Sequence, residues 1–347
     1  MNIFSKTNWF QLLEIAISQN ASDIHLTAEQ RPFLRKNGQL ISLELPMPDN
    51  EQVEEVISSL ITNQQRQLFN QNKELDFAWN FNMRRWRFNL YKQRNKLALA
   101  GRLIPNIIPS LNELGCPSIF DELLTKKHGL ILITGRTGAG KTTTIASFLN
   151  TLANRSAHHI ITLEDPIEYI ISTEKSFISQ REYGTDFFSF PVALKSALRQ
   201  CPDCLMIGEL RDMETIRTAL DASSTGHLVL ATLHTNSAVE TMLRLESFFP
   251  AECQHIRAQL SSVLLASITQ QLLPCPNGQR VCAFEVMTST PAISNLIRTG
   301  KYQQINSAIL SGKSNGMVMM DDSINELRRK KLLFPEINNQ NLSEKKI

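Results

Sequence analysis

Short apolar runs and longer amphipathic stretches alternate along the chain from about residue 120 onward. Uninterrupted apolar runs of four to six residues are typical of strands that are buried on both faces of a parallel sheet. The runs of this kind are Gly129–Thr134, His159–Leu163, Cys204–Ile207 and Leu228–Thr232. Between them lie helix-compatible stretches such as residues 142–154 and 191–200. The alternation predicts a doubly wound α/β core.

The first hundred residues show a different pattern. Apolar residues at helical spacing predict helices over residues 8–19 and 51–69. Strands that follow one another without helices between them pair in antiparallel fashion, with Asn37-Gly38 at one tight turn. The predicted strands are residues 23–27, 33–36, 40–43, 85–91 and 96–103. We therefore expect a small α/β unit with an antiparallel sheet backed by helices.

Prolines separate the two patterns, as is common in a linker between domains. The three prolines are Pro105, Pro109 and Pro117. We place the first domain at residues 1–105, the linker at 106–119 and the second domain at 120–347. The end of the second domain, at about 285–335, is predicted to be mainly helical, and the Asn-rich tail that follows is predicted to be disordered.

Composition limits the classes of protein that need be considered. A chain of 347 residues with 42% hydrophobic and 20% charged residues can bury two cores. It has no apolar run long enough to span a bilayer and no signal-peptide pattern at its start. We therefore expect a protein on the cytoplasmic side of any membrane that it serves.

Charge and cysteine content argue against two further classes of site. The net charge of +3 is too small and too dispersed to indicate a nucleic-acid surface. The basic and aromatic stretch Arg84–Arg102 could bind single strands, but half-exposed antiparallel strands explain the same pattern. Only Cys201 and Cys204 form a C-x-x-C pair, so no zinc tetrad is predicted, and we expect reduced thiols.

The clearest chemical motif is a phosphate-binding loop. Its context supports the match, because an apolar strand leads into it and a helix-compatible stretch leaves it. Backbone amides and the helix N-terminus would surround the phosphates, Lys141 would contact the β- and γ-phosphates, and the Thr142 hydroxyl would coordinate Mg²⁺. We count Thr143 with this ATP and Mg²⁺ site. The motif is Gly135, Arg136, Thr137, Gly138, Ala139, Gly140, Lys141 and Thr142.

Acidic residues follow two of the predicted strands, where a P-loop enzyme needs a carboxylate. Glu164 and Glu168 come after the strand that ends at Leu163, and Glu209 comes after the strand that ends at Ile207. A carboxylate in such a place can also be a helix cap or a loop anchor. Two acidic strand ends in one P-loop domain favour a function in ATP hydrolysis.

Two histidines bracket the last predicted parallel strand. His234 follows the strand, so it could sense the γ-phosphate or hold the glutamate that acts in hydrolysis. His227 precedes the strand and is a further candidate for nucleotide binding. A histidine at a strand end is otherwise a structural hydrogen-bonding group.

Taken together, four blocks resemble the ATPase superfamily of type II secretion and type IV pili. They are the P-loop, an aspartate box (Thr162–Glu168), a Walker B block (Pro202–Asp212) and a histidine box (Thr225–Asn236). Residues 21–26 and 31–38 are similar to the PAS-like N-terminal domain of that family. The resemblance covers nearly the whole chain, and it implies a PAS-like domain followed by a RecA-like P-loop ATPase domain.

Within the superfamily the chain is most similar to the pilus-retraction (PilT-type) group. The likeness lies in residues 270–274, 290–298 and 316–317. We also expect the chain to begin at the PAS-like domain, without the long extension and the paired C-x-x-C module of the assembly and secretion ATPases. Gln200, Cys201, Ser294 and Thr299 depart from the pattern of the group, which concerns retraction more than ATP hydrolysis.

The resemblance implies roles for individual residues. Glu168 would activate the attacking water, and Glu209 would act on Mg²⁺ or its water, with the division between them left open. Thr142 and Glu209 would be the metal ligands. Arg87 and Arg102 would reach the γ-phosphate as the domains close.

The resemblance also implies partners. It suggests a homohexamer that acts on inner-membrane pilus platform proteins and meets the membrane only through protein partners, with a paralogous retraction ATPase as a further candidate. No nucleic-acid partner is expected. The alternatives are a pilus-assembly or type II secretion motor, a hexameric nucleic-acid translocase, and a degenerate nucleotide-binding scaffold.

Overall fold

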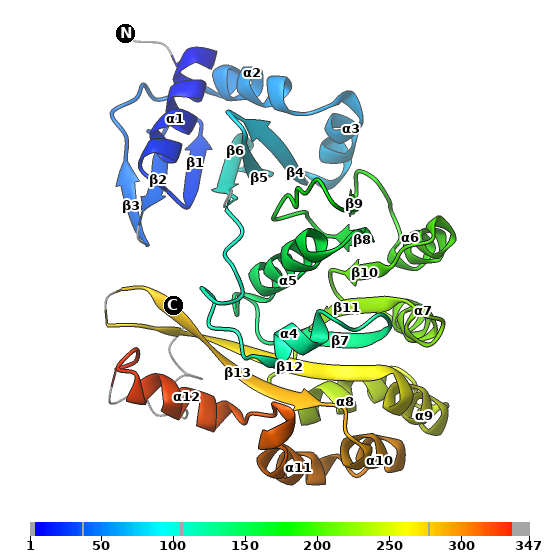
Figure 1. The fold of residues 1–347 in the computed structure, drawn as a ribbon. Coiled ribbons are helices and arrows are strands. Elements are labelled where there is room, and N and C mark those ends of the chain that lie inside the picture. The colour runs from blue at the N-terminus through cyan, green and yellow to red at the C-terminus, as the bar shows by residue number, and fades with distance from the viewer. Residues whose placement is uncertain (1–3, 37, 105–106, 277, 335–347) are drawn as a thin grey trace. The chain divides into compact units, whose positions relative to one another are not determined.

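A computed structural model describes residues 4–36, 38–104, 107–276 and 278–334 of the chain. The chain divides into two compact units, Met1–Ile107 and Ile108–Ile347. Each unit has its own sheet and its own hydrophobic core (Figure 1). In the described part of the chain, no helix has the length and apolar character that crossing a bilayer requires.

The described residues of the first unit form one six-stranded sheet with three helices. All its neighbouring strands pair in antiparallel fashion, in the order β3-β2-β1-β6-β5-β4. The helices are α1 (Lys6–Ser18), α2 (Asn50–Leu60) and α3 (Asn63–Asn72). The strands are β1 (Asp23–Thr27), β2 (Phe33–Lys36), β3 (Gln39–Ser42), β4 (Glu74–Phe81), β5 (Arg84–Gln93) and β6 (Lys96–Leu103).

The two faces of this sheet differ in polarity, because side chains alternate between faces along a strand. On β5, Trp86, Phe88 and Leu90 are buried, and they pack in one core with Trp9 of α1 and Ile57 of α2. The residues between them along β5 point to the other face, which is polar. The alternation therefore places Arg87 of β5, and Arg102 opposite it on β6, on the face away from the core.

The second unit contains a seven-stranded sheet and most of the helices. Its strands are β7 (Gly129–Thr134), β8 (His159–Glu164), β9 (Phe177–Glu182), β10 (Cys204–Ile207), β11 (Leu228–Leu233), β12 (Leu264–Pro274) and β13 (Arg280–Thr288). Its longer helices are α5 (Lys141–Arg155), α6 (Phe190–Ala197), α7 (Met213–Ser224), α8 (Ala238–Ser247), α9 (Cys253–Val263), α10 (Pro291–Thr299) and α12 (Met320–Arg329). Two shorter ones are α4 (Ile119–Leu123) and α11 (Ile305–Ser311).

The topology of this sheet brings several strand ends to one edge. The order is β13-β12-β7-β11-β10-β8-β9, and all neighbouring pairs are parallel except β12 and β13. Helices α4 and α5 pack on one face of the sheet, whereas α6 to α11 contribute to the core on the other. The carboxyl ends of β7, β8, β10 and β11 therefore meet at the edge where ligands bind in doubly wound sheets.

The predicted fold class is confirmed. The four predicted parallel strands are β7, β8, β10 and β11, and the predicted antiparallel strands of the first unit are also present. The predicted helix over residues 51–69 is divided into α2 and α3, because Thr62 caps the start of α3. The prediction did not include β4, β9, β12 and β13. Residues 108–119, predicted as a linker, belong to the second unit, where Leu111 and Ile119 are in the core.

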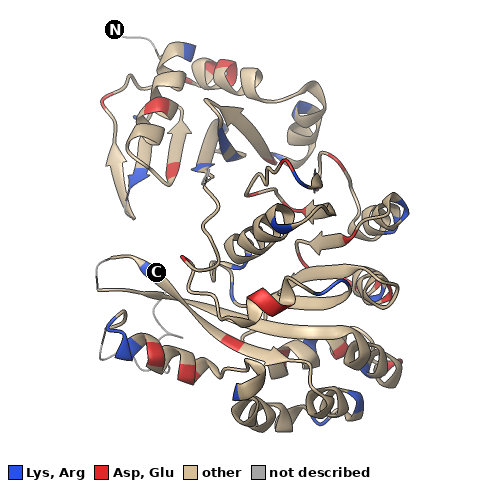
Figure 2. Ribbon diagram, in the orientation of Figure 1, with Lys and Arg blue, Asp and Glu red and all other residues tan. Residues whose placement is uncertain are grey.

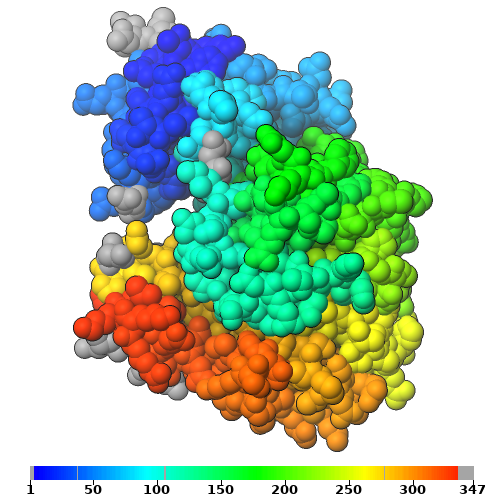
Figure 3. Space-filling model, viewed as in Figure 1, coloured from blue at the N-terminus to red at the C-terminus, as the bar shows by residue number. Residues whose placement is uncertain are grey.

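The predicted helical region at the end of the second unit is present from Pro291 onward, after β13 ends at Thr288. Its helices α10, α11 and α12 form a continuous stretch of the surface (Figure 3). Positions of Lys and Arg and of Asp and Glu are distributed along both units (Figure 2). The predicted disordered tail and Asn37 lie outside the described residues.

Candidate nucleotide-binding site

The P-loop connects β7 to α5, as the sequence predicts. Gly135, Gly138 and Gly140 all have positive φ angles, of 140°, 81° and 88°. Gly135 also has no room for a side chain, because an added Cβ would lie 2.5 Å from the carbonyl oxygen of Gln270 on β12. The loop therefore needs glycine both for its backbone conformation and for its close approach to the neighbouring strand.

Lys141 opens helix α5 and lies under the loop. Its side chain is 8% exposed, and its Nζ donates hydrogen bonds to the carbonyl oxygens of Gly135 (2.7 Å) and Arg136 (3.2 Å). Burial lowers the pKa of this ammonium, while Glu209 and Glu168 act in the opposite direction. One buried cation is thus influenced by two carboxylates that come from different strand ends.

Glu164, the last residue of β8, is buried and held by two donors. Thr162 Oγ1 and Gln180 Nε2 both donate to its Oε1, at 2.6 and 3.0 Å. Burial raises the pKa of this carboxyl to about 7, although the two hydrogen bonds favour the charged form. Glu164 also lines a small cavity with Thr142 and Tyr169. Its carboxyl therefore titrates near neutral pH beside the P-loop helix.

Glu168 lies four residues farther along the aspartate box and is half-buried. Its backbone neighbour Ile167 donates to Glu182 Oε2 at 3.0 Å. On its other side, the Tyr169 hydroxyl hydrogen-bonds to Thr143 Oγ1 of α5 at 3.1 Å. The residue that follows the aspartate box thus attaches it to the first turn of the P-loop helix.

Glu209 lies at the centre of a small polar network beyond the end of β10. Arg211 Nε donates to Glu209 Oε2 at 2.7 Å, and Arg211 Nη1 lies 3.1 Å from Asp165 Oδ2. His234 Nε2 is 3.4 Å from the same Glu209 oxygen. Arg211 therefore joins the Walker B block to the aspartate box.

His234 connects this network to the P-loop. Its Nδ1 lies 3.4 Å from both Lys141 Nζ and Thr137 Oγ1. An ammonium can only donate, so the contact with Lys141 requires Nδ1 to accept and assigns the ring proton to Nε2, facing Glu209. A neutral His234 can thus link Lys141 to Glu209.

Arg136 joins the P-loop to the histidine box, whereas His227 lies at the other edge of the sheet. Arg136 Nε donates to Asn236 Oδ1 at 3.0 Å, and Arg136, Thr137 and Gly138 are exposed. His227 precedes β11 at the opposite edge of the sheet, where its Nδ1 lies 3.1 Å from the Ala222 carbonyl oxygen. A six-residue strand spans about 20 Å. The geometry therefore does not support the predicted role of His227 at the P-loop of the same chain.

The donor atoms at this edge fit a magnesium ion that is bound mainly by nucleotide phosphates. Thr142 offers a hydroxyl and Glu209 a carboxylate, both of them hard oxygen ligands. The described residues include no cluster of three or more His, Cys, Asp or Glu side chains arranged to hold a metal by themselves. Few protein ligands are usual for Mg²⁺, which keeps several waters and is completed by phosphate oxygens.

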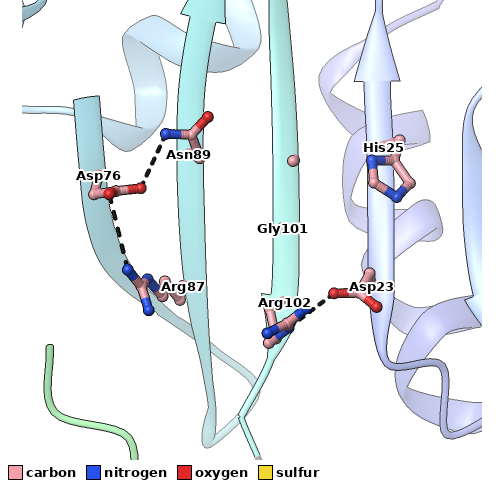
Figure 4. A pocket seen from close by; sticks show the side chains of 8 residues that line it. Asp23, His25, Asp76, Arg87, Asn89, Gly101 and Arg102 are labelled. Atoms are coloured by element: carbon pink, nitrogen blue, oxygen red, sulfur yellow. Dashed lines mark hydrogen bonds and ion pairs between the residues drawn. The ribbon is translucent and has the colours of Figure 1, made fainter. Parts of the chain in front are cut away.

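Arg87 and Arg102 belong to the first unit, where they are direct neighbours across β5 and β6. Like charges placed opposite each other destabilise a sheet. Each arginine has an acidic neighbour: Arg102 Nε lies 2.9 Å from Asp23 Oδ1, and Arg87 Nη2 lies 3.8 Å from Asp76 Oδ2 (Figure 4). The two acids reduce the repulsion between the arginines, but the pairing of two like charges still needs an explanation.

These side chains line a shallow concavity of about 220 Å³ on the polar face of the sheet, together with His25 and Asn89 (Figure 4). Asn89 Nδ2 donates to Asp76 Oδ1 at 3.0 Å, which fixes that carboxylate. His25 Nε2 is buried and finds no hydrogen-bond partner among the described residues, and burial lowers the pKa of His25. The arrangement offers two oriented cations to an anion.

Several residues of the site were not predicted from the sequence. Arg211 was part of the Walker B block, but nothing in its spacing indicated that it would bridge Glu209 and Asp165. Tyr169 and Gln180 gave no signal, because Gln180 lies on a strand that was not predicted. Asp23 could have been predicted from the sequence, because pairing of β1 with β6 places Asp23 beside Arg102.

Comparisons with known proteins agree with this geometry. The family model described as "type II/IV secretion system protein" matches residues 6–331. The type IV pilus retraction ATPase PilT of Pseudomonas aeruginosa is 41% identical over 328 residues, covering 94% of this chain and 95% of that protein. A twitching motility protein of Neisseria gonorrhoeae is 40% identical over 328 residues, covering 94% of this chain and 88% of that protein.

A solved structure gives the same result for the fold. The crystal structure of the pilus retraction motor PilT with bound ADP superposes with a TM-score of 0.89 at 39% identity, covering 96% of this chain and 98% of that one. The predicted resemblance is confirmed. The chain belongs to the type II/IV secretion system protein family, and within that family it is similar to the pilus retraction ATPases.

Proposed function

We propose that the protein is a Mg²⁺-dependent ATPase that works as a homohexameric motor and drives retraction of type IV pili. The observation that carries the ATPase part is Lys141, which is buried under the P-loop, donates to the Gly135 carbonyl and is influenced by the carboxylates of Glu209 and Glu168. The ADP bound to the similar PilT structure supports binding of a nucleotide. Membership of an ATPase family supports hydrolysis rather than binding alone.

Glycine geometry and helix position explain how the triphosphate would bind. The P-loop leads directly into the N-terminus of α5, and that end of a helix favours negative charge. Lys141 would exchange its contacts with the loop carbonyls for contacts with phosphate oxygens. Thr142 and Glu209 would hold Mg²⁺, which supplies charge neutralisation at the phosphates when it is bound.

Hydrolysis requires a base for the attacking water. Glu168 is half-buried, and we propose that its carboxylate orients the water and accepts its proton. Glu209 would act from the other side through its contacts with Arg211 and His234. Glu164, which titrates near neutral pH, would support the aspartate box from within and could hold a proton close to Thr142.

The paired arginines of the first unit fit a second part of the proposal. Arg87 and Arg102 present an anion-binding arrangement that costs stability on its own, which favours a functional role. We propose that they reach the γ-phosphate when the domains close and stabilise the charge that develops during transfer. Closure and reopening would then convert binding and hydrolysis of ATP into rigid-body motion.

The retraction part of the proposal follows from the relatives. A pilus retraction ATPase and a twitching motility protein match almost the whole chain, so both units are retained. The proposed partners are pilus platform proteins of the inner membrane, with a paralogous retraction ATPase as a further candidate. The proposed place of action is the cytoplasmic base of the pilus machine.

The ATPase proposal is tested by phosphate release from the purified protein with ATP and Mg²⁺. Lys141→Ala should lower turnover at least roughly a hundredfold, because it removes a cation that contacts the transferred group. Lys127→Ala, at an exposed position outside the site, should keep the wild-type rate. Equal rates for Lys141→Ala and wild type would refute the proposed site.

The retraction proposal is tested in a Pseudomonas aeruginosa strain that lacks PilT. Expression of the wild-type chain should restore twitching and lower the number of surface pili, whereas Lys141→Ala should do neither. Restored pilus assembly in an assembly-deficient strain, without an effect on twitching in the PilT-deficient strain, would favour the alternative of an assembly motor.

A nucleic-acid translocase is the less supported alternative. Asp23 and Asp76 lie beside the exposed arginines, so the polar face of the first unit is not a uniformly basic surface of the kind that phosphate backbones need. An ATPase rate that rises severalfold on addition of DNA or RNA would favour this alternative.

A further inference from the structure

The aspartate-box loop after β8 is held from outside by side chains of the neighbouring strand β9. Gln180 Nε2 donates to the Tyr169 carbonyl oxygen at 2.8 Å, and Gln180 Oε1 accepts from the Ile171 amide at 2.8 Å. Glu182 Oε2 accepts from the Ile167 amide at 3.0 Å. Backbone groups on both sides of Glu168 are therefore fixed by β9.

A second attachment joins the same loop to the P-loop helix. The Tyr169 hydroxyl lies 3.1 Å from Thr143 Oγ1, and Thr143 follows the P-loop residues Lys141 and Thr142 on the first turn of α5. Tyr169 is 8% exposed, and burial raises the pKa of its phenol, so the hydroxyl stays protonated and needs a partner inside the protein. This hydrogen bond joins the loop directly to the first turn of α5.

Glu168 is the residue between these attachments. Its carboxylate acts on the ammonium of Lys141 and on the phenol of Tyr169. The side chain of Glu209 is fixed by its contacts with Arg211 and His234, whereas the constraints on Glu168 come from the backbone on either side of it. The placement of Glu168 therefore depends on the backbone that carries it.

Gln180 also links the loop to Glu164, the buried residue at the end of β8. Its amide nitrogen also donates to Glu164 Oε1 at 3.0 Å, so one side chain contacts the last residue of β8 and the backbone on both sides of residue 170. Edge strand β9 thus serves as the outer support of the loop.

We propose that Tyr169 and Gln180 are positioning residues that hold Glu168 at the correct distance from the P-loop helix. Neither residue needs to contact nucleotide for this role. The proposal rests on the proposed ATPase function, in which Glu168 orients and deprotonates the attacking water. A displacement of about 1 Å in a reacting group can cost on the order of a hundredfold in rate, so loss of one of several attachments should cost less.

The test is Tyr169→Phe, which removes only the hydroxyl. We expect kcat for ATP to fall roughly tenfold, because Glu168 is less well oriented. KM should stay within about twofold of the wild-type value, and the midpoint of thermal unfolding should stay within about 2 °C of wild type. Gln180→Met should lower kcat in the same way. Tyr183→Phe is the matched control, since Tyr183 is 43% exposed, and it should keep the wild-type kcat.

A double variant separates positioning from a general structural effect. In a Glu168→Gln background, measured by single-turnover phosphate release, Tyr169→Phe should cause no further loss, because the group that it positions is already inactive. A tenfold loss in that background as well, an unchanged kcat in Tyr169→Phe, or a raised KM with unchanged kcat would each overturn the inference. Absence of Mg²⁺-dependent ATPase activity in the wild type would instead refute the proposed function.

Discussion

Burial of the Glu164 carboxyl among neutral and acidic groups leads to a testable prediction about how the stability of the protein depends on pH. Its contacts are the hydroxyl of Thr162 and the amide of Gln180, and the charged groups that act on it, Glu168 and Glu182, are both acidic. The perturbation is Glu164→Gln. The amide oxygen of the new side chain can accept both hydrogen bonds, since both are donated to Oε1 in the wild type.

The sign of the effect follows from the direction of the pKa change. Burial raises the pKa of Glu164 from 4.5 to about 7 in the folded protein. Below pH 4.5 the carboxyl is protonated in both folded and unfolded chains and costs nothing. As the pH rises toward 7 the unfolded chain releases this proton first, so the folded wild type loses stability. At about 1.4 kcal/mol per pKa unit, the full loss is roughly 3 kcal/mol.

The assay is urea unfolding of wild type and Glu164→Gln, followed at about pH 5, 6, 7 and 8. Other titrating groups are shared by the two proteins, so their contributions cancel in the difference. The stability of the variant relative to wild type should increase by about 2 to 3 kcal/mol from about pH 5 to pH 8 and then level off. A difference that is the same at every pH would show that Glu164 titrates normally, and it would refute the reasoning from burial.

Three further predictions concern the nucleotide site. Gly135→Ala should destabilise the protein by more than about 1 kcal/mol and weaken ADP binding, because the added methyl group would clash with Gln270. Gly184 also has a positive φ but has open space around it. Gly184→Ala, measured in the same unfolding and ADP titration experiments, therefore separates the effect of the clash from that of backbone strain. Removal of Mg²⁺ with EDTA should abolish turnover and leave ADP binding measurable by calorimetry, whereas an unchanged rate would contradict the proposed metal. Arg102→Gln should lower kcat at least roughly tenfold without weakening ADP binding, and a wild-type kcat would contradict its proposed role at the γ-phosphate.

The buried parallel strands could be predicted well because their apolar runs have a single physical explanation. Strand β7 has no exposed residue, and neither β10 nor β11 has one. A strand that is covered on both faces must be apolar throughout, and each of these strands is followed by the polar residues of the site. The same pattern is sufficient to place the P-loop, Glu209 and His234 at one edge of the sheet.

The missed strands lack such a pattern. Strand β9 is an edge strand with mostly half-buried polar residues, so neither a continuous apolar run nor a clean alternation marks it. Helix α9 passes directly into β12 at Val263 and Leu264, without a glycine or proline to mark the change. Strand β4 was the most accessible of the four, because Leu75, Phe77, Trp79 and Phe81 alternate with polar or small residues.

The candidate site divides in the same way. Motif spacing predicted which residues belong to the P-loop and which acids follow the strands, because these positions are fixed by local chain geometry. It could not predict that Arg211 contacts both Glu209 and Asp165, or that Tyr169 contacts Thr143. These contacts depend on how two loops pack, and loop packing leaves no periodic signal in a single sequence.

The central claim is that Glu168, held beside the P-loop, deprotonates the water that cleaves ATP. The most direct test measures ATP-analogue affinity and phosphate release in wild type, Glu168→Gln and the exposed control Glu174→Gln. We expect Glu168→Gln to bind the analogue with an affinity close to that of wild type while its turnover falls at least about a hundredfold, and Glu174→Gln to match wild type in both. Turnover by Glu168→Gln at the wild-type rate would contradict the account.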